Sequence, residues 1–262
     1  MPTQSLHEIR TISSYKIHHY GKVSSTNDVA KEIARKTQEP KIVIIAETQT
    51  HARGRHRRHW VSPRGGIWLS ILLRPRVTPK EATKLTFITA TAVAESIQNT
   101  LDLATEVKWP NDVLVNRRKL CGILTEASTR ENAVEFVVVG IGINANIDLQ
   151  SLPSDLQKSV TTLKHELAHE INRETLTKDL IQSFDQRYRR LQKGMWGALL
   201  QEWRGFAKFL GGKVVVTSFA ETIVGKALDV DADGALIIKL QDGALKKVVA
   251  GDVSQVALST FG

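Results

Sequence analysis

The chain of 262 residues has one cysteine and no long apolar run. Because a lone Cys121 cannot form an internal disulfide, the sequence excludes a small secreted domain held together by disulfides, and it agrees with a reducing compartment. No stretch reaches the roughly 18 consecutive apolar residues of a membrane-spanning helix. Residues 1–16 also lack the apolar core of a secretory signal peptide. These absences predict a cytoplasmic protein without a membrane partner.

The composition that remains is typical of a globular protein with excess basic residues. Hydrophobic residues make up 42% and charged residues 24% of the chain, so it can bury a core. The length suits one large domain, or a medium one plus a small one. Residues 211–262 hold five Lys against six Asp and Glu, which gives them a net charge of −1. Because the whole chain carries a net charge of +9, residues 1–210 carry +10. That surface attracts ATP, pyrophosphate, an acidic protein or nucleic acid, and charge alone does not choose among them.

Apolar periodicity predicts an α+β fold in which a central mixed β-sheet is flanked by helices and followed by a small β-barrel. Residues 1–14 are expected to be a loosely ordered tail of a larger domain over 1–210, and the glycines at 211 and 212 mark the start of the barrel over 211–262. The strands and hairpins are expected at 41–47, 66–75, 106–127 with its turn at 116–118, and 133–146. The helices are expected from about 27, over 79–101, and over 161–206 with a break near 193–194.

A basic segment between two predicted strands is the clearest functional signal. Arg53, Arg55, Arg57 and Arg58 repel one another within six positions, so this segment should stay mobile until an anion neutralises it. Gly54 would let the backbone approach that anion closely. A solvated basic turn is the alternative interpretation.

Two further polar clusters lie where apolar runs end. "SSTN" places short hydrogen-bonding side chains at the start of a helix, where they suit either a neutral polar ring or a simple N-cap. "KWPND" ends in Asp112, which can hold Mg²⁺ on phosphates, although a Pro-Asn-Asp turn is common. "GIGIN" lacks the third glycine of a dinucleotide fingerprint, so that interpretation is rejected.

One motif points to different chemistry. "HELAH", from His165 to His169, has the spacing that places two imidazoles on one helix face to bind zinc, with Glu166 as general base. The third histidine that often extends this motif does not follow. No acidic residue downstream is singled out as a third ligand; the candidates are Glu170, Glu174, Asp179 and Asp185. A solvated helix face, with Leu163, Leu167 and Ile171 buried behind it, is the favoured interpretation, and a zinc metallopeptidase is the alternative.

Taken in order, "KVSSTND", "AETQTHARGRHRRHWVSPRGG", "VKWPNDVLVNRRKLCGIL" and "VVVGIGINAN" resemble the biotin protein ligases. The resemblance implies a catalytic domain of the class II synthetase-like biotin/lipoate ligase fold and a C-terminal barrel of the Src-homology type. It implies ATP-dependent attachment of biotin to a lysine of the biotin carboxyl carrier protein domain of acetyl-CoA carboxylase or a related carboxylase. The intermediate would be biotinyl-5′-AMP, with pyrophosphate and then AMP released. Lipoate-protein ligases are the nearest enzymes by fold, but "GRHRRHW" with "KWPND" favours biotin.

The resemblance also assigns site residues, with Lys119, Arg55 and Asp112 as the catalytic groups. Mg²⁺ would bind at Asp112 through the phosphates, ATP and biotin would be substrates, and no tightly bound cofactor is expected. Cys121 is expected to be packing rather than a nucleophile. The biotin-binding residues would be Ser25, Thr26, Asn27, Gln49, Arg53, Gly54, Arg55, Lys119 and Gly122. The ATP-binding residues would be Arg53, Arg55, Trp60, Lys108, Asn111, Asp112, Lys119 and Asn144.

The sequence departs from the family pattern at two positions. The family usually has glycine where this chain has Ala52, and often has another where it has Arg57. With these two departures, the sequence does not determine how the loop closes over its ligand. About twenty residues precede "SSTN", too few for a helix-turn-helix domain, so no specific DNA binding is expected. An exposed strand of the central sheet would allow a homodimer, and the sequence does not decide this point.

Overall fold

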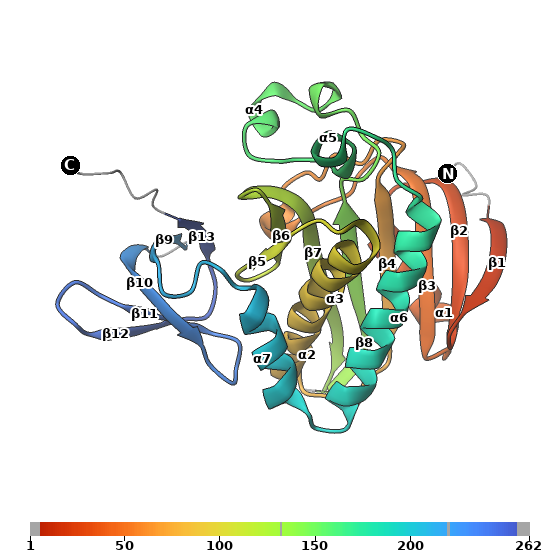
Figure 1. The fold of residues 1–262 in the computed structure, drawn as a ribbon. Helices are drawn as coiled ribbons and strands as arrows, with labels where there is room; N and C mark the ends of the chain where they lie inside the picture. The colour runs from red at the N-terminus through yellow and green to blue at the C-terminus, as the bar shows by residue number, and fades with distance from the viewer. Residues whose placement is uncertain (1–5, 132, 219–220, 256–262) are drawn as a thin grey trace.

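A mixed β-sheet of eight strands forms the centre of the larger part of the molecule (Figure 1). The computed structural model describes residues 6–131, 133–218 and 221–255. The strand order is β1-β2-β3-β4-β8-β7-β6-β5, and only β2 and β3 pair in parallel. The strands are β1 (Leu6–Ile12), β2 (Tyr15–Val23), β3 (Lys41–Gln49), β4 (Ile67–Leu73), β5 (Glu106–Lys108), β6 (Asp112–Val115), β7 (Arg118–Arg130) and β8 (Ala133–Ile143). The predicted α+β class with a central mixed sheet is confirmed.

The N-terminal segment is a strand, so the prediction of a loosely ordered tail over residues 1–14 is wrong for residues 6–12. β1 pairs antiparallel with β2, from Leu6 opposite Tyr20 to Ile12 opposite Tyr15. The apolar residues of "LHEIRTI" fall at every third position, so the segment lacks the alternation of a half-buried strand, and its pairing with β2 provides the backbone hydrogen bonds that the sequence alone did not reveal. Residues 1–5 lie outside the described part of the chain.

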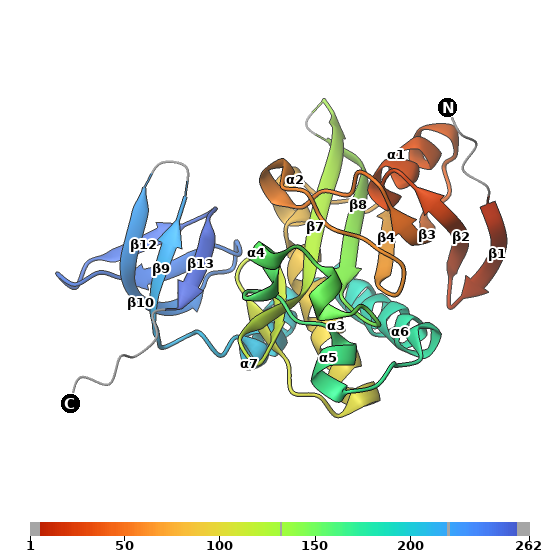
Figure 2. The ribbon, with the colours of Figure 1, turned by 90° about the horizontal axis from the view of Figure 1, so that it is seen from above.

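Helices cover both faces of this sheet (Figure 2). Helix α1 (Thr26–Lys36) lies on one face, with Val29, Ala30 and Ala34 buried against it. α3 (Lys84–Leu101) and α6 (Arg173–Gln192) lie together on the other face and bury a continuous apolar core. The predicted helix over 79–101 is divided at Thr83 into α2 (Pro79–Ala82) and α3. The remaining short helices are η1 (Arg55–Arg57), η2 (Leu149–Ser151), α4 (Ser154–Gln157) and α5 (Leu163–Leu167), and α7 (Trp196–Phe206) is a longer helix.

A second, antiparallel sheet follows α7 and packs beside it (Figure 1). Its order is β12-β11-β10-β9-β13, and we call this part of the chain, residues 213–255, the C-terminal sheet. The indole N–H of Trp109 donates to the Gly234 carbonyl at 2.9 Å, and Arg204 pairs with Asp229 at 2.6 Å. These contacts hold the sheet against the larger domain. Its strands are β9 (Lys213–Thr217), β10 (Thr222–Val230), β11 (Leu236–Lys239), β12 (Leu245–Val248) and β13 (Asp252–Gln255).

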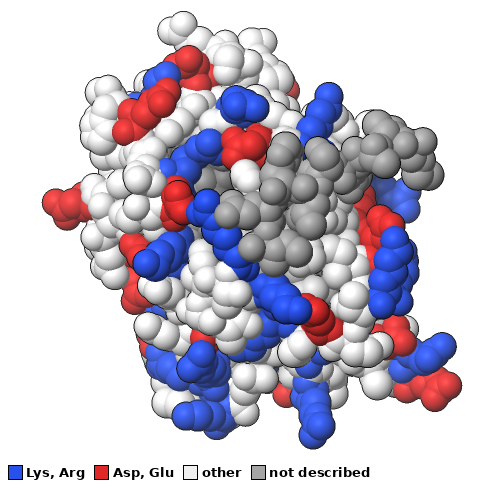
Figure 3. All heavy atoms as spheres, turned by 90° about the vertical axis from the view of Figure 1, so that its right-hand side faces the viewer, with Lys and Arg blue, Asp and Glu red and all other residues white. Residues whose placement is uncertain are grey.

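Part of the basic surface is neutralised locally. Figure 3 shows lysine and arginine side chains on one face of the molecule with acidic side chains among them. Exposed pairs such as Lys16 with Glu39 at 2.5 Å and Lys36 with Glu32 at 2.6 Å contribute little to stability. Within the described residues, no helix is both long and apolar enough to cross a membrane.

Candidate functional site

Every predicted site residue lines one cavity of about 480 Å³. The cavity lies on the sheet where β4, β7 and β8 pair, and the segment between β3 and β4, residues 50–66, covers it; we call this segment the basic loop. The residues thus brought together are Ser25, Thr26, Asn27, Gln49, Arg53, Gly54, Arg55, Trp60, Lys108, Asn111, Asp112, Lys119, Gly122 and Asn144.

One end of the cavity carries neutral polar side chains around the start of α1. Ser25 occupies the N-cap position, yet its side chain makes no capping hydrogen bond, so the helix does not use its hydroxyl. The backbone N–H of Thr26 donates to Gln49 Oε1 at 2.8 Å, and Gln49 Nε2 donates to Ser62 Oγ at 3.0 Å. Gln49 is therefore held by its own contacts with its oxygen toward Thr26. We call Ser25, Thr26, Asn27 and Gln49 the ring end of the cavity, because short neutral side chains of this kind suit a neutral polar ring.

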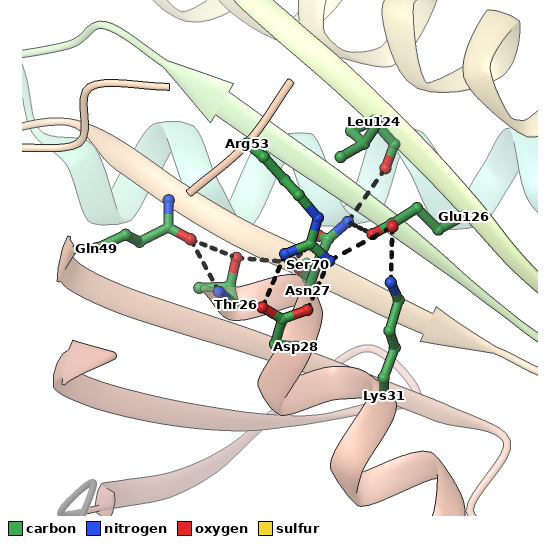
Figure 4. Close-up of polar contacts among 9 residues, drawn as sticks. All are labelled: Thr26, Asn27, Asp28, Lys31, Gln49, Arg53, Ser70, Leu124 and Glu126. Atoms are coloured by element: carbon green, nitrogen blue, oxygen red, sulfur yellow. Dashed lines mark hydrogen bonds and ion pairs between the residues drawn. The ribbon is translucent and has the colours of Figure 1, made fainter. Parts of the chain in front are cut away.

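Asn27 lies flat against β8. A Cβ atom at Gly140 would come within 2.3 Å of Asn27 Oδ1, so only glycine permits this packing. The Asn27 amide nitrogen donates to Glu126 Oε2 at 2.7 Å, and its oxygen lies 2.6 Å from Ser70 Oγ (Figure 4). These contacts hold the side chain in one orientation at the edge of the cavity.

Arg53 ties the basic loop to α1. Its guanidinium donates to both carboxylate oxygens of Asp28, at 2.8 and 2.6 Å, and lies 3.5 Å from Glu126 (Figure 4). The Arg53 hydrogen bond holds the pKa of Asp28 below its ordinary value. Such forked pairs are geometrically specific. Arg53 therefore anchors the loop in this state while still lining the cavity.

The other end of the cavity is cationic. Lys119 Nζ lies 2.6 Å from Asp112 Oδ1, and Lys108 Nζ lies 3.2 Å from Asp112 Oδ2. Antiparallel pairing of β6 with β7 places Asp112 opposite Gly122, which brings these charges together. The Lys119 ammonium also lies 5.1 Å from the centre of the Trp60 ring. Two ammonium groups sharing one carboxylate leave a net positive charge for an anion. We call Lys108, Asp112 and Lys119 the cationic end.

Arg55 connects the loop to two other parts of the chain. Its Nη1 donates to Asn111 Oδ1 at 3.2 Å, to the Gly251 carbonyl at 3.1 Å and to Asp252 Oδ1 at 3.2 Å. Burial lowers the pKa of Arg55 from its ordinary value, although the group stays charged at any neutral pH. Arg58 pairs with the same carboxylate at 2.6 Å. The C-terminal sheet thus holds the basic loop over the cavity.

Trp60 and Asn144 complete the lining. A Cβ at Gly142 would lie 2.6 Å from the Trp60 indole nitrogen, and one at Gly122 would lie 2.9 Å from its ring. These two glycines let the indole lie directly on the sheet. The Asn144 amide donates to the Thr161 carbonyl at 3.0 Å, so it also holds the segment that precedes α5.

The zinc-binding interpretation of "HELAH" does not fit the backbone. α5 ends at Leu167, and Ala168 takes a left-handed φ of 61°, so the two histidines do not lie four residues apart on one helix. His165 and His169 are both exposed, as the solvated-face interpretation predicts. Glu166 binds Arg118 at 2.7 Å and Asn116 at 2.6 Å. Among the residues that the structure describes, no group of three or more His, Cys, Asp or Glu could hold a metal.

Sequence reasoning missed four side chains that organise this site. Ser70 is the only polar residue in the buried strand "IWLSILL", and Glu126 lies two residues after the run "GIL" on β7. A polar group where an apolar one is expected is a signal that could have identified both. Asp28 and Asp252 carried no local signal, because their partners are distant in sequence.

Comparison with known proteins shows which family this chain is similar to. Residues 20–144 match the Biotin/lipoate A/B protein ligase family, and residues 209–255 match the Biotin protein ligase C terminal domain. The Bifunctional ligase/repressor BirA of Bacillus spizizenii is 34% identical over 232 residues, which cover 88% of this chain and 71% of that protein. The chain belongs to the biotin protein ligase family.

Other family members support the assignment over most of the chain. The Biotin--[acetyl-CoA-carboxylase] ligase of Mycobacterium tuberculosis is 31% identical over 218 residues, covering 81% of this chain and 78% of that enzyme. The fold resembles that of the biotin protein ligase from Aquifex aeolicus in complex with biotin and ATP, with a TM-score of 0.78 at 24% identity. That match covers 91% of this chain and 97% of the other. The C-terminal sheet accordingly corresponds to the C-terminal domain of biotin protein ligases.

Proposed function

We propose that this protein attaches biotin to a lysine of a carboxylase carrier domain, with ATP as the source of energy. The observation that carries the proposal is the shared cavity, which places a neutral polar ring end beside a cationic end. Biotin has both chemistries, since its cyclic urea is neutral and its carboxylate is an anion. Relatives named as ligases of acetyl-CoA carboxylase support a carboxylase carrier domain as the acceptor.

In the first step, the biotin carboxylate attacks the α-phosphorus of ATP and pyrophosphate leaves. Two anions must meet, and cations have to offset their repulsion. Lys119 and Lys108 stand at the cationic end, and Arg55 approaches from the loop with a forked donor group. We assign Lys119 to the reacting carboxylate and phosphate. Ser25, Thr26, Asn27 and Gln49 would hold the urea ring.

Asp112 fits the binding of Mg²⁺ in the usual manner of nucleotide enzymes. Mg²⁺ is often held by one or two carboxylates together with phosphate oxygens and water. Asp112 offers one nearly buried carboxylate, whose two lysine partners are free to turn to phosphates when ATP arrives. When bound there, the ion would neutralise charge on the phosphates. Biotinyl-AMP then stays under the basic loop until a lysine amine attacks its acyl carbon and AMP leaves.

The test is to incubate the metal-stripped protein with biotin and α-labelled ATP, with and without Mg²⁺, and to analyse the bound fraction by mass. We expect a Mg²⁺-dependent biotinyl-adenylate that disappears, with release of AMP, when a biotin carrier domain is added. Formation of a lipoyl-adenylate from lipoate in preference to biotin would assign the lipoate ligase reaction instead. Formation of neither adenylate would overturn the proposal.

A further inference from the structure

Glu166, in the segment "HELAH", joins two parts of the chain that meet beside Lys119. It lies in α5, and only 6% of its side chain is exposed. Its Oε2 accepts from the Asn116 amide at 2.6 Å and its Oε1 accepts from Arg118 at 2.7 Å, so it holds the turn between β6 and β7. Oε1 also accepts from the Thr161 hydroxyl, which lies in the segment before α5. One carboxylate therefore fastens both parts of the chain.

These contacts hold Glu166 in its charged form. Burial by itself would raise the pKa of Glu166, but hydrogen bonds from Thr161 and Asn116 and the charge of Arg118 outweigh it, so the pKa is lowered. An ionised carboxylate only accepts hydrogen bonds, so all three partners donate to it. A side chain without an acceptor at this position would lose all three contacts together.

The same two parts of the chain also pair at the backbone of Lys119. The Lys119 N–H donates to the Ser159 carbonyl at 2.9 Å, and the Thr161 N–H donates to the Lys119 carbonyl at 2.9 Å. This pairing is a single parallel bridge between Lys119 and Val160 rather than a ladder of strands. On its other side Lys119 pairs with Leu114 at a β-bulge, where the register of β6 and β7 shifts. The backbone of Lys119 therefore depends on short, irregular pairing on both sides.

Residues 159–163, which we call the wall segment, also hold Asn144 just after β8. The Asn144 amide donates to the Thr161 carbonyl at 3.0 Å, and the Asn144 carbonyl accepts from the Leu163 N–H at 2.8 Å. Part of the wall segment lines the cavity. One segment thus positions both Lys119 and Asn144.

We propose that Glu166 is a positioning residue that holds Lys119 at the cationic end of the cavity by fastening the wall segment to the β6–β7 turn. The inference rests on the proposed function, in which Lys119 meets the biotin carboxylate and the reacting phosphate. Glu166 lies outside the cavity lining and acts through the two backbone hydrogen bonds of Lys119. A misplacement of about 1 Å at a reacting group can lower a rate on the order of 100-fold, so this link bears on the rate of adenylate formation.

The experiment measures the single-turnover rate of biotinyl-adenylate formation on the full chain, with saturating biotin and Mg²⁺-ATP. Glu166→Leu keeps a side chain of similar size and removes every acceptor, so the rate should fall by about 10- to 100-fold. Biotin binding by calorimetry should change much less, because the ring end is held by separate contacts.

The variant Lys119→Ala separates positioning from general damage. If Glu166 acts through Lys119, Glu166→Leu should lower the rate no further in the Lys119→Ala background, because residues that act as a unit are not additive. A further loss as large as the loss in the wild-type background would assign Glu166 a general structural role and overturn the inference.

A second pair of variants tests the other end of the link. Thr161 is fully buried, and Thr161→Val keeps the shape of its side chain but loses the hydroxyl that donates to Glu166, so the rate should fall. Thr161→Ser keeps the hydroxyl and should stay near the wild-type rate. Glu170→Gln is the matched control, since it changes an exposed carboxylate that pairs with Lys164, and it should also keep the rate.

The outcomes decide between the two hypotheses. A wild-type rate in either Glu166→Leu or Thr161→Val overturns the role of Glu166, so the test stands even if one of these variants does not fold. Wild-type protein that forms no biotinyl-adenylate overturns the proposed function, and this inference with it.

Discussion

At the scale of single residues, Asp112 is held from two sides, since its carboxylate pairs with both Lys108 and Lys119. We expect Asp112→Ala to weaken binding of Mg²⁺-ATP about tenfold, or about 1.4 kcal/mol, while biotin binding changes less. ATP without Mg²⁺ should bind no more weakly, because the variant leaves two ammonium groups without their counter-charge. Calorimetry with and without Mg²⁺ measures the difference.

Asp112→Asn serves as the matched variant, because it keeps an oxygen ligand and loses only the charge. It should fall between wild type and Asp112→Ala. If Mg²⁺ raises the ATP affinity of Asp112→Ala as much as it raises that of the wild type, Asp112 does not bind the metal ion.

At the scale of an element, the basic loop is held at several points, and Arg55 provides contacts to both the β5–β6 turn and the C-terminal sheet. Removing them should let the loop open before the acyl group is transferred. We therefore expect Arg55→Gly to release biotinyl-AMP. The readout is biotin on bystander proteins mixed with the enzyme, which should rise at least tenfold.

Arg57→Gly is the matched control in the same loop. Arg57 is exposed and takes a left-handed φ of 59°, a conformation that glycine adopts without steric cost. Bystander biotinylation should stay at the wild-type level in this variant. Equal release from both variants would show that loop flexibility, rather than the Arg55 contacts, controls retention.

At the scale of the whole molecule, the joint between the larger domain and the C-terminal sheet depends on close packing at Gly234. Its φ is +84°, and a Cβ there would lie 2.9 Å from the ring of Phe87. Phe87 in turn packs edge-on against Trp196 and Trp203, at 5.8 and 4.9 Å between ring centres. Gly234→Ala should therefore destabilise the protein by about 2–4 kcal/mol in denaturant unfolding.

Gly243→Ala isolates the backbone contribution to that cost. Gly243 has a similar φ of +87° in the turn between β11 and β12, but a Cβ there meets nothing within 4 Å. This variant should lose only about 1–2 kcal/mol from backbone strain. Equal losses in the two variants would mean that the contact with Phe87 does not contribute.

Local patterns predicted most of the elements, since apolar periods identified the central strands and α1. The residues that line the cavity were predicted from the resemblance of four polar segments to the biotin protein ligases, and apolar periodicity alone did not assign them. The prediction failed for residues 6–12, whose pairing with β2 has only a weak local pattern. It also missed the end of α5 at Leu167, because the left-handed turn at Ala168 has no glycine to mark it.

The sequence by itself determined which chemical groups are available, since residue types and their spacing along a strand or helix are local properties. Only the tertiary structure decided how those groups are paired. Asn27 meets Glu126 across 99 positions, and Arg55 meets Asp252 across 197. Such contacts depend on strand register and on how two sheets pack, and neither leaves a mark in the local pattern. The contact of Asn27 with Glu126 and the contact of Arg55 with Asp252 are therefore properties of the folded molecule.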